Sequence, residues 1–230
     1  MTAGSALPQG EEKAGAVRAL FDAIAGRYDL VNRLMTFGLD VGWRRRTVGS
    51  LRLPGGALVL DLACGTGDLC RELIAAGYRA VGFDFSHQML VHAGTEAPLV
   101  EADVLRLPVE DARADGITCG FALRNVADLG AFFDELGRVV RPGGRIALLD
   151  ASEPDNPVLR AGHGVYFRRV VPLIGAALSN REAYAYLPRS MAYLPSPATM
   201  LAMLQEAGFS DADRRQLTGG AAQLLTGTRA

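Results

Sequence analysis

Cysteine is scarce in this 230-residue chain. The three cysteines, Cys64, Cys70 and Cys119, form no CxxC pair and have no neighbouring pair of histidines, so we expect neither a zinc site nor another metal site. An odd set of thiols without pairing also fits a reducing compartment better than a secreted disulfide framework. The expected location is therefore the cytoplasm.

Long apolar runs and a charge excess are also missing. The longest strongly apolar stretch, residues 170–178, is far shorter than the roughly 20 residues that span a bilayer. Residues 1–15 lack a basic segment followed by an apolar run, and we expect a flexible tail there rather than a signal peptide. A net charge of −1 and a pI near 6.3 give no overall attraction for phosphates, so no nucleic-acid partner is expected.

The apolar residues of the chain follow two different patterns of spacing, one helical and one typical of buried strands. With 49% hydrophobic residues it can bury one core, and residues 16–230 are expected to form a single domain. From residue 16 to 46 the apolar residues recur at helical spacing, with breaks near Gly26 and Gly38. This pattern predicts an N-terminal helical segment.

Short apolar runs then alternate with helix-like stretches. Residues 157–207 interrupt the alternation and are expected to form a helical insertion that caps a substrate site, and the last residues can supply two closing strands around Gly219 and Gly220. The sequence thus predicts an α/β fold with a doubly wound, mostly parallel sheet of seven strands. The runs typical of strands buried on both faces are 57–63, 79–85, 98–103, 116–123 and 144–152.

The stretch VLDLACGTGDLC, residues 59–70, joins a predicted strand to a predicted helix through a glycine-rich turn. Gly65 and Gly67 let a ligand approach the backbone at the carboxyl end of the strand, where open parallel sheets bind nucleotides. Asp61 would sit poorly beside a pyrophosphate and suits a ligand that carries an ammonium and a sulfonium. Cys70 stands where the dinucleotide fingerprint GxGxxG has its third glycine, which weakens the interpretation as a nicotinamide site without removing it.

Two more acidic residues end the next two predicted strands. The Asp84 carboxylate can accept hydrogen bonds from both hydroxyls of a ribose, and Asp103 is placed to reach an adenine amino group. Three acids at three successive strand ends suit a cationic nucleotide. The pattern D-x-A-x-G-x-G resembles the first motif of the class I methyltransferases, which have a Rossmann-like fold and use S-adenosylmethionine.

Longer stretches resemble a narrower family. In their order along the chain, from about residue 17 to the end, they are similar to the ubiquinone/menaquinone biosynthesis C-methyltransferases. The resemblance implies transfer of a methyl group from S-adenosylmethionine to a ring carbon of a polyprenylated quinol, either demethylmenaquinol or the related benzoquinol. The stretches are FDAIAGRYDLVNRLMTFGLDVGWRRR (21–46), FALRNVADL (121–129), RVVRPGGRI (138–146), AYAYLPRSMAYLP (183–195) and LTGG (217–220).

The resemblance also implies which residues hold the cofactor. By position they are Thr66, Asp84, Ala102, Asp103 and Gly120. The family usually has serine where this chain has Gly120, so one hydrogen bond of the family pattern is not available here. The segment after LTGG lacks a histidine that is common in the family, which leaves the choice of substrate open.

Catalytic roles are expected for residues near the fourth and fifth predicted strands. The sulfonium is already activated, so the protein has to orient the ring, raise its electron density and exclude water. We expect Arg124 to stabilise the developing phenolate, because a guanidinium stays protonated at ordinary pH. A water held by Asn125 and the carboxylate of Asp150 form the expected route for the proton.

Substrate contacts are expected from the two helical segments. Tyr28 and Asn32 lie four residues apart on one helical face and are assigned to a lid over the site. His163 is a candidate substrate contact, and Tyr184 and Tyr186 can line a tunnel for the prenyl chain.

Several alternatives stay open. Residues 157–178 combine apolar side chains with arginines, which predicts weak peripheral contact with the inner face of an anionic membrane. A homodimer is one arrangement that the sequence allows. The same cofactor residues would serve a methyltransferase of another phenolic metabolite. A nicotinamide-linked oxidoreductase and a non-catalytic protein that binds S-adenosylmethionine or a quinone are the alternatives from other classes.

Overall fold

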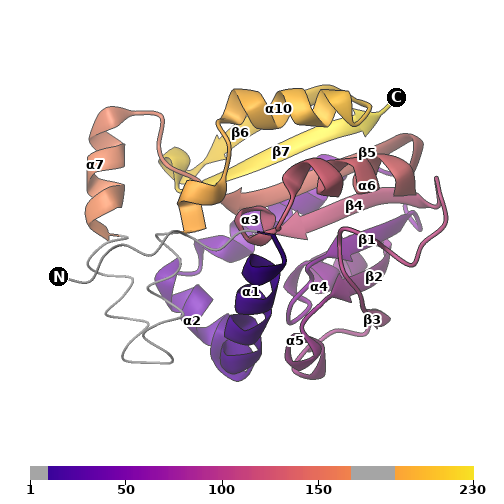
Figure 1. The fold of residues 1–230 in the computed structure, drawn as a ribbon, viewed down its shortest axis with the longest axis horizontal. Helices are drawn as coiled ribbons and strands as arrows, with labels where there is room; N and C mark the ends of the chain where they lie inside the picture. The colour runs from indigo at the N-terminus through magenta and orange to yellow at the C-terminus, as the bar shows by residue number, and fades with distance from the viewer. Residues whose placement is uncertain (1–9, 167–189) are drawn as a thin grey trace.

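Seven strands form one sheet in the computed structural model, which describes residues 10–166 and 190–230. The strand order is β3-β2-β1-β4-β5-β7-β6 (Figure 1). Strands β1 to β5 pair in parallel, and β7 lies antiparallel to both β5 and β6. The doubly wound, mostly parallel sheet of seven strands is thus confirmed. The strands are β1 Leu58–Leu62, β2 Arg79–Asp84, β3 Leu99–Glu101, β4 Ala114–Gly120, β5 Val140–Ala151, β6 Phe209–Leu217 and β7 Ala222–Arg229.

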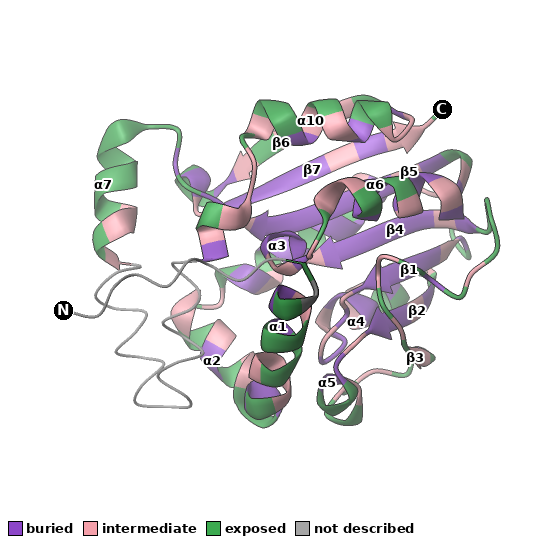
Figure 2. Cartoon of the chain, viewed as in Figure 1, coloured by how far each residue is buried: buried purple, intermediate pink, exposed green. Residues whose placement is uncertain are grey.

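Helices cover both faces of this sheet. On one face α6 buries Phe132 and α10 buries Leu204, whereas on the other face α3 buries Leu51 and α4 buries Leu73. Figure 2 shows the buried strands between helices whose outer surfaces are exposed. Because both faces of the central strands are covered, their sequences are continuously apolar rather than alternating. The helices concerned are α3 Leu39–Leu51, α4 Asp68–Ala75, α5 His87–Val91, α6 Leu129–Val139 and α10 Pro197–Glu206.

The N-terminal helical segment begins earlier than the sequence predicts. It consists of α1 (Gly10–Ile24), the 3-10 turn η1 (Ala25–Arg27), α2 (Tyr28–Met35) and the first part of α3, with the predicted breaks near Gly26 and Gly38. The boundary of the expected tail at residue 15 is therefore wrong, since α1 already starts at Gly10. Residues 1–9 lie outside the described part of the chain.

Lys13 explains why the first turns of α1 are ordered. Its side chain is buried, its Nζ donates a hydrogen bond of 2.6 Å to the carbonyl of Val126, and the same atom lies 3.9 Å from the centre of the Tyr193 ring. Burial lowers the pKa of this amine to about 8. These contacts attach α1 to segments that are distant in the sequence.

The insertion before the last two strands is helical in its described parts. It comprises α7 (Pro157–Val165), the short turn η4 (Met191–Tyr193) and α10. Tyr184, Tyr186 and the part of 157–178 beyond residue 166 lie outside the described residues. Across 10–166 and 190–230, the structure holds no helix with the length and apolar character that a bilayer span requires.

The strand order fixes where a ligand can bind. The chain passes from β1 to β2 and β3 on one side and then returns to place β4 on the other side of β1. Such a switch point leaves a crevice at the carboxyl ends of β1 and β4. In Figure 1, α1 and α2 lie at the end of the sheet toward which the arrows of β4 and β5 point.

Candidate active site

The glycine-rich turn starts where β1 ends. Gly65 and Gly67 have φ angles of 55° and 82°, in the left-handed region that glycine adopts without strain. A Cβ atom on Gly67 would lie 2.7 Å from Cγ2 of Thr95, whereas one on Gly65 would meet no atom within 4 Å. Packing therefore requires glycine at position 67, and Gly65 keeps the backbone bare on a side that is open to a ligand.

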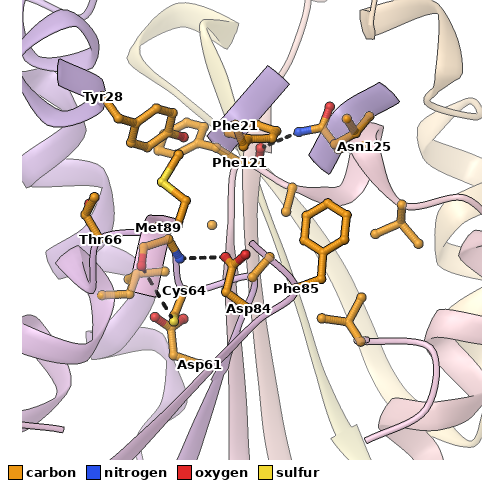
Figure 3. A pocket seen from close by; sticks show the side chains of 18 of the residues that line it. Phe21, Tyr28, Asp61, Cys64, Thr66, Asp84, Phe85, Met89, Phe121 and Asn125 are labelled. Atoms are coloured by element: carbon orange, nitrogen blue, oxygen red, sulfur yellow. Dashed lines mark hydrogen bonds between the residues drawn. The ribbon is translucent and has the colours of Figure 1, made fainter. Parts of the chain in front are cut away.

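Asp84 ends β2 beside this turn. Its carboxylate accepts hydrogen bonds of 2.8 Å from the backbone N–H of Gly65 and of 2.8 Å from that of Ser86. The side chain is buried, and burial raises the pKa of the carboxyl group. Figure 3 shows the Asp84 carboxylate turned toward the cavity. Each of its oxygens still has a lone pair for a hydroxyl donor of a ligand.

Asp61 lies below the turn, in β1. The Thr118 hydroxyl donates a hydrogen bond of 2.8 Å to one oxygen of its carboxylate, and the Cys70 thiol donates one of 3.4 Å to the other. Burial raises the pKa of Asp61 to about 7, and nearby Arg44 acts against this increase. At neutral pH the protonated and ionised forms of this carboxyl group are about equally populated. A cation placed beside it lowers its pKa and shifts it to the ionised form.

The first prediction concerns the pH dependence of Asp61. Its pKa of about 7 in the folded chain lies above the ordinary value of 3.8. The proton that it holds stabilises the folded state fully below about pH 3.8, and this contribution is lost as the pH rises through 7. A cationic ligand favours the ionised form, so binding of S-adenosylmethionine at pH 6 is expected to release a proton.

Calorimetry at pH 6 in buffers of different ionisation enthalpy measures this release. The Asp61→Asn variant has no proton to lose at this position and should show a binding heat that no longer depends on the buffer. An equal proton release in the wild type and the variant would contradict the assignment.

A cavity separates the strand ends from the N-terminal helices. It holds about 1030 Å³ of empty space, including the space at its open mouth. Its two sides differ in chemistry (Figure 3). Asp61, Asp84 and the backbone of Gly65 line the side at the strand ends. The rings of Phe21, Tyr28 and Phe121 lie together on the other side.

The helix α2 is attached directly to the glycine-rich turn. The hydroxyl of Thr66, a buried residue of the turn, donates a hydrogen bond to the carboxylate of Asp29. Tyr28 lines the cavity, whereas Asn32 does not and instead hydrogen-bonds the Tyr28 side chain. Burial raises the pKa of the Tyr28 hydroxyl, and the charge of Arg124 acts against it. The structure therefore brings the two expected lid residues together, with Tyr28 alone facing the cavity.

Three further predicted cofactor residues lie around the cavity. Asp103 is exposed at its rim, and its carboxylate accepts a hydrogen bond of 2.9 Å from the N–H of Leu105. Ala102 is not among the lining residues, but its N–H donates to the carbonyl of Asp84, at 2.9 Å. Gly120 lines the cavity at the end of β4, and a Cβ atom there would lie 2.8 Å from Cδ1 of Leu69. A serine at position 120 would therefore require Leu69 to move.

The three predicted catalytic residues form one group. Arg124 and Asp150 make a buried ion pair, and Asp150 also accepts a hydrogen bond of 3.1 Å from the backbone N–H of Arg124. Asn125 lines the cavity and donates a hydrogen bond of 3.4 Å to the carbonyl of Phe121. Arg124 and Asp150 are not among the lining residues, so the ion pair stands behind the wall that Phe121 and Asn125 form.

His163 lies apart from this group. It belongs to α7 and is not among the residues that line the cavity, and burial lowers the pKa of its imidazole. Sequence reasoning missed Arg44, which is buried and lines the cavity from α3. The run WRRR could have indicated a basic residue at the site. Nothing in that run distinguishes the buried Arg44 from Arg45 and Arg46, which are exposed.

The residues present fit S-adenosylmethionine. The Asp84 carboxylate beside the bare backbone of Gly65 suits ribose hydroxyls, and Asp61 supplies the anion that a sulfonium and an ammonium require. The aromatic residues Phe21, Tyr28 and Phe121 also give the cavity an apolar surface.

Comparison with known proteins agrees with this geometry. The ubiE/COQ5 methyltransferase family matches residues 8–229. A demethylmenaquinone methyltransferase of Roseiflexus castenholzii is 43% identical over 231 residues, with 97% of each chain covered. The ubiquinone/menaquinone biosynthesis C-methyltransferase UbiE of Syntrophotalea carbinolica is 40% identical, with 92% of this chain and 93% of the relative covered.

Solved structures confirm the class of fold. A chain of the complex between the Haloferax volcanii Trm112 methyltransferase activator and a methyltransferase superposes with a TM-score of 0.66 at 18% identity, with 90% of this chain and 96% of that chain covered. Phosphoethanolamine N-methyltransferase 2 of Haemonchus contortus, solved with S-adenosyl-L-methionine, gives 0.61 at 12% identity, with 82% and 52% covered. The fold, the family match and the relatives over nearly the full length lead to one conclusion: this chain belongs to the ubiE/COQ5 methyltransferase family.

Proposed function

We propose that this protein transfers the methyl group of S-adenosylmethionine to a ring carbon of a polyprenyl quinol, with demethylmenaquinol as its substrate. The observation that carries the proposal is the division of the cavity into an acidic side at the glycine turn and an aromatic side beneath α1 and α2. The relatives named demethylmenaquinone methyltransferase support the naphthoquinol over the benzoquinol.

Bound S-adenosylmethionine supplies an activated methyl group, and the residues of the chain prepare the acceptor. Asp61, Gly65 and Asp84 are the residues that would hold the cofactor. Phe21 and Phe121 give the acceptor ring an apolar wall, which also excludes water from the reacting atoms.

Arg124 raises the electron density of the ring in this proposal. Its guanidinium stays protonated and stabilises the negative charge that develops on a ring oxygen, and the buried carboxylate of Asp150 holds it in place. Asn125 lines the cavity and can orient a water that takes the hydroxyl proton toward Asp150. After methyl transfer, the proton on the methylated ring carbon has to leave as well, through the same water, so that the ring becomes aromatic again. In this proposal the charge of Arg124 stabilises the phenolate, and the amide of Asn125 positions the water that removes the proton. Activation of the quinol requires both.

Mass spectrometry of the products tests the proposed function. The protein is incubated in detergent with S-adenosylmethionine and either demethylmenaquinol or the demethylated benzoquinol. We expect a gain of one methyl group on the naphthoquinol ring and a slower reaction with the benzoquinol. Methylation of neither quinol, by a protein that binds S-adenosylmethionine, would refute the quinol as substrate.

We also propose peripheral contact with the membrane in which a polyprenyl quinol resides. Exposed apolar side chains gather at the end of α2 and on the turn to α3, where Phe37 is 76% exposed. The Phe37 ring lies 6.0 Å from that of Tyr166, whose hydroxyl bonds the carbonyl of Met35, so this turn is joined to the end of α7. The exposed apolar residues of these two segments are Leu30, Leu34, Phe37 and Leu39, from α2 to the start of α3, and Val158, Leu159 and Val165 on α7.

Replacing Leu34 and Phe37 together by glutamate is expected to abolish sedimentation with vesicles of phosphatidylglycerol and phosphatidylcholine. Both changes remove apolar area and add charge that anionic lipids repel. Activity on a water-soluble quinol analogue without a prenyl tail should be unchanged. The matched control is Val91→Glu, since Val91 is an exposed apolar residue on α5. Absence of vesicle binding by the wild type at low salt would refute the membrane proposal.

A further inference from the structure

Arg44 is a buried cation at the cofactor cavity that the mechanism above does not use. It lies on α3, only 6% of the residue is exposed, and its side chain lines the cavity together with Asp61, Gly65 and Asp68. Within the part of the chain that the structure describes, it is the only basic residue that lines this cavity. An arginine buried in this way needs partners, because an unpaired charge is costly away from water.

Two carboxylates and one aromatic ring hold the guanidinium in place. Arg44 forms an ion pair with Asp40 one turn earlier on α3, and its Nη2 lies 2.9 Å from the carboxylate of Asp68 at the start of α4. The guanidinium carbon lies 5.5 Å from the centre of the Phe121 ring. A guanidinium has five N–H donors, so these two carboxylates leave donors for a ligand.

The cluster around Arg44 carries more positive than negative charge. Three guanidinium groups share two carboxylates, so one positive charge is in excess. An anionic group of a ligand can therefore bind here without displacing either carboxylate. The members of the cluster are Arg33, Arg44 and Arg71 on one side and Asp40 and Asp68 on the other.

The charges of the cavity match the amino-acid end of S-adenosylmethionine. That end carries one ammonium and one carboxylate, and the acids at the strand ends suit only the first of these. Arg44 and Asp61 both line the cavity, and the charge of Arg44 acts on the Asp61 carboxyl group. A basic and an acidic side chain of the protein therefore lie close together in this part of the cavity. We propose that Arg44 binds the α-carboxylate of S-adenosylmethionine, while Asp61 faces the cationic groups. The proposal rests on the proposed function for its ligand.

Two ligands that differ by one carboxylate test this assignment. S-adenosylmethionine and its decarboxylated form share the adenosine, the sulfonium and the ammonium. Calorimetry of the wild type should show that loss of the carboxylate weakens binding by roughly 10- to 100-fold, as expected for one charge-assisted contact. Equal affinity of the wild type for both ligands would overturn the proposal, and this comparison needs no variant.

The Arg44→Gln variant should lose the same factor for S-adenosylmethionine and keep the affinity of the wild type for the decarboxylated ligand. Arg44→Lys keeps the charge next to Asp40 and Asp68, and it serves where the glutamine variant does not fold. Its loss should again be confined to the ligand with a carboxylate. Arg45→Gln is the matched control, because the neighbouring Arg45 is exposed and pairs with Glu72 on the surface.

An equal loss for both ligands in the Arg44 variants would give Arg44 a purely structural role and refute the proposal. The proposed function fails in a different way. In that case the wild type binds neither ligand, or it binds S-adenosylmethionine but methylates no quinol.

Discussion

Replacing Asp84 by alanine is expected to lower the affinity for S-adenosylmethionine by roughly 10²- to 10⁴-fold. In the proposed site the substitution removes two charge-assisted hydrogen bonds to the ribose, each about 1.5–3 kcal/mol. A difference of about 1.4 kcal/mol corresponds to a factor of ten in affinity. It also removes the acceptor of the N–H groups of Gly65 and Ser86, which hold the turn against the end of β2. Equilibrium dialysis or calorimetry measures the affinity.

The control for Asp84→Ala is Asp103→Ala. Asp103 is exposed at the rim of the same cavity, so its removal should cost only about a factor of ten. Thermal unfolding of both variants shows whether the sheet is intact. A folded Asp84→Ala protein that binds S-adenosylmethionine like the wild type would exclude Asp84 from the cofactor site.

The second large effect is expected from Arg124→Lys. Turnover should fall roughly 100-fold, because the positive charge behind the wall would move away from the position at which it stabilises the developing phenolate. A lysine ammonium is a point charge that cannot pair with the Asp150 carboxylate in the planar, forked geometry of a guanidinium. The affinity for S-adenosylmethionine should not change, because Arg124 is not among the residues that line the cavity.

Single-turnover rates and cofactor affinity have to be measured together for this variant. If the affinity for S-adenosylmethionine decreases in parallel with the rate, Arg124 acts on the cofactor and not on the phenolate. Arg138→Lys is the matched control, since Arg138 lies in the last turn of α6 and pairs with Glu135 and Asp111. That variant should retain the turnover of the wild type.

The sheet and the acids at its strand ends could be predicted because both depend on local patterns. Buried parallel strands have continuous apolar runs, and the strand expected at residues 57–63 is observed as β1, Leu58–Leu62. Once the strands are placed, their carboxyl ends share one edge, which brings Asp61, Gly65 and Asp84 together without further information.

The start of α1 and the burial of Arg44 could not be predicted in the same way, because both depend on distant partners. The start of α1 is stabilised by Lys13, which bonds the carbonyl of a residue 113 positions away. The polar composition of that region alone is typical of a tail. Arg44 is buried only because Asp68 begins α4 beside it, and the sequence WRRR gives all three arginines the same appearance.

Lys13 is the only lysine of the chain, and it is buried where α1 meets Val126 and Tyr193. A lysine-directed acylating reagent therefore finds a single side-chain target, and it reaches this amine only while α1 is lifted from the molecule. The rate of labelling therefore measures how often α1 lifts from the molecule, in the way that amide exchange reports local unfolding. The mass of the peptide that carries Lys13 separates this label from one on the N-terminal amine. Measured with and without ligand, the labelling rate reports how often α1 lifts and how strongly an occupant of the cavity keeps it in place.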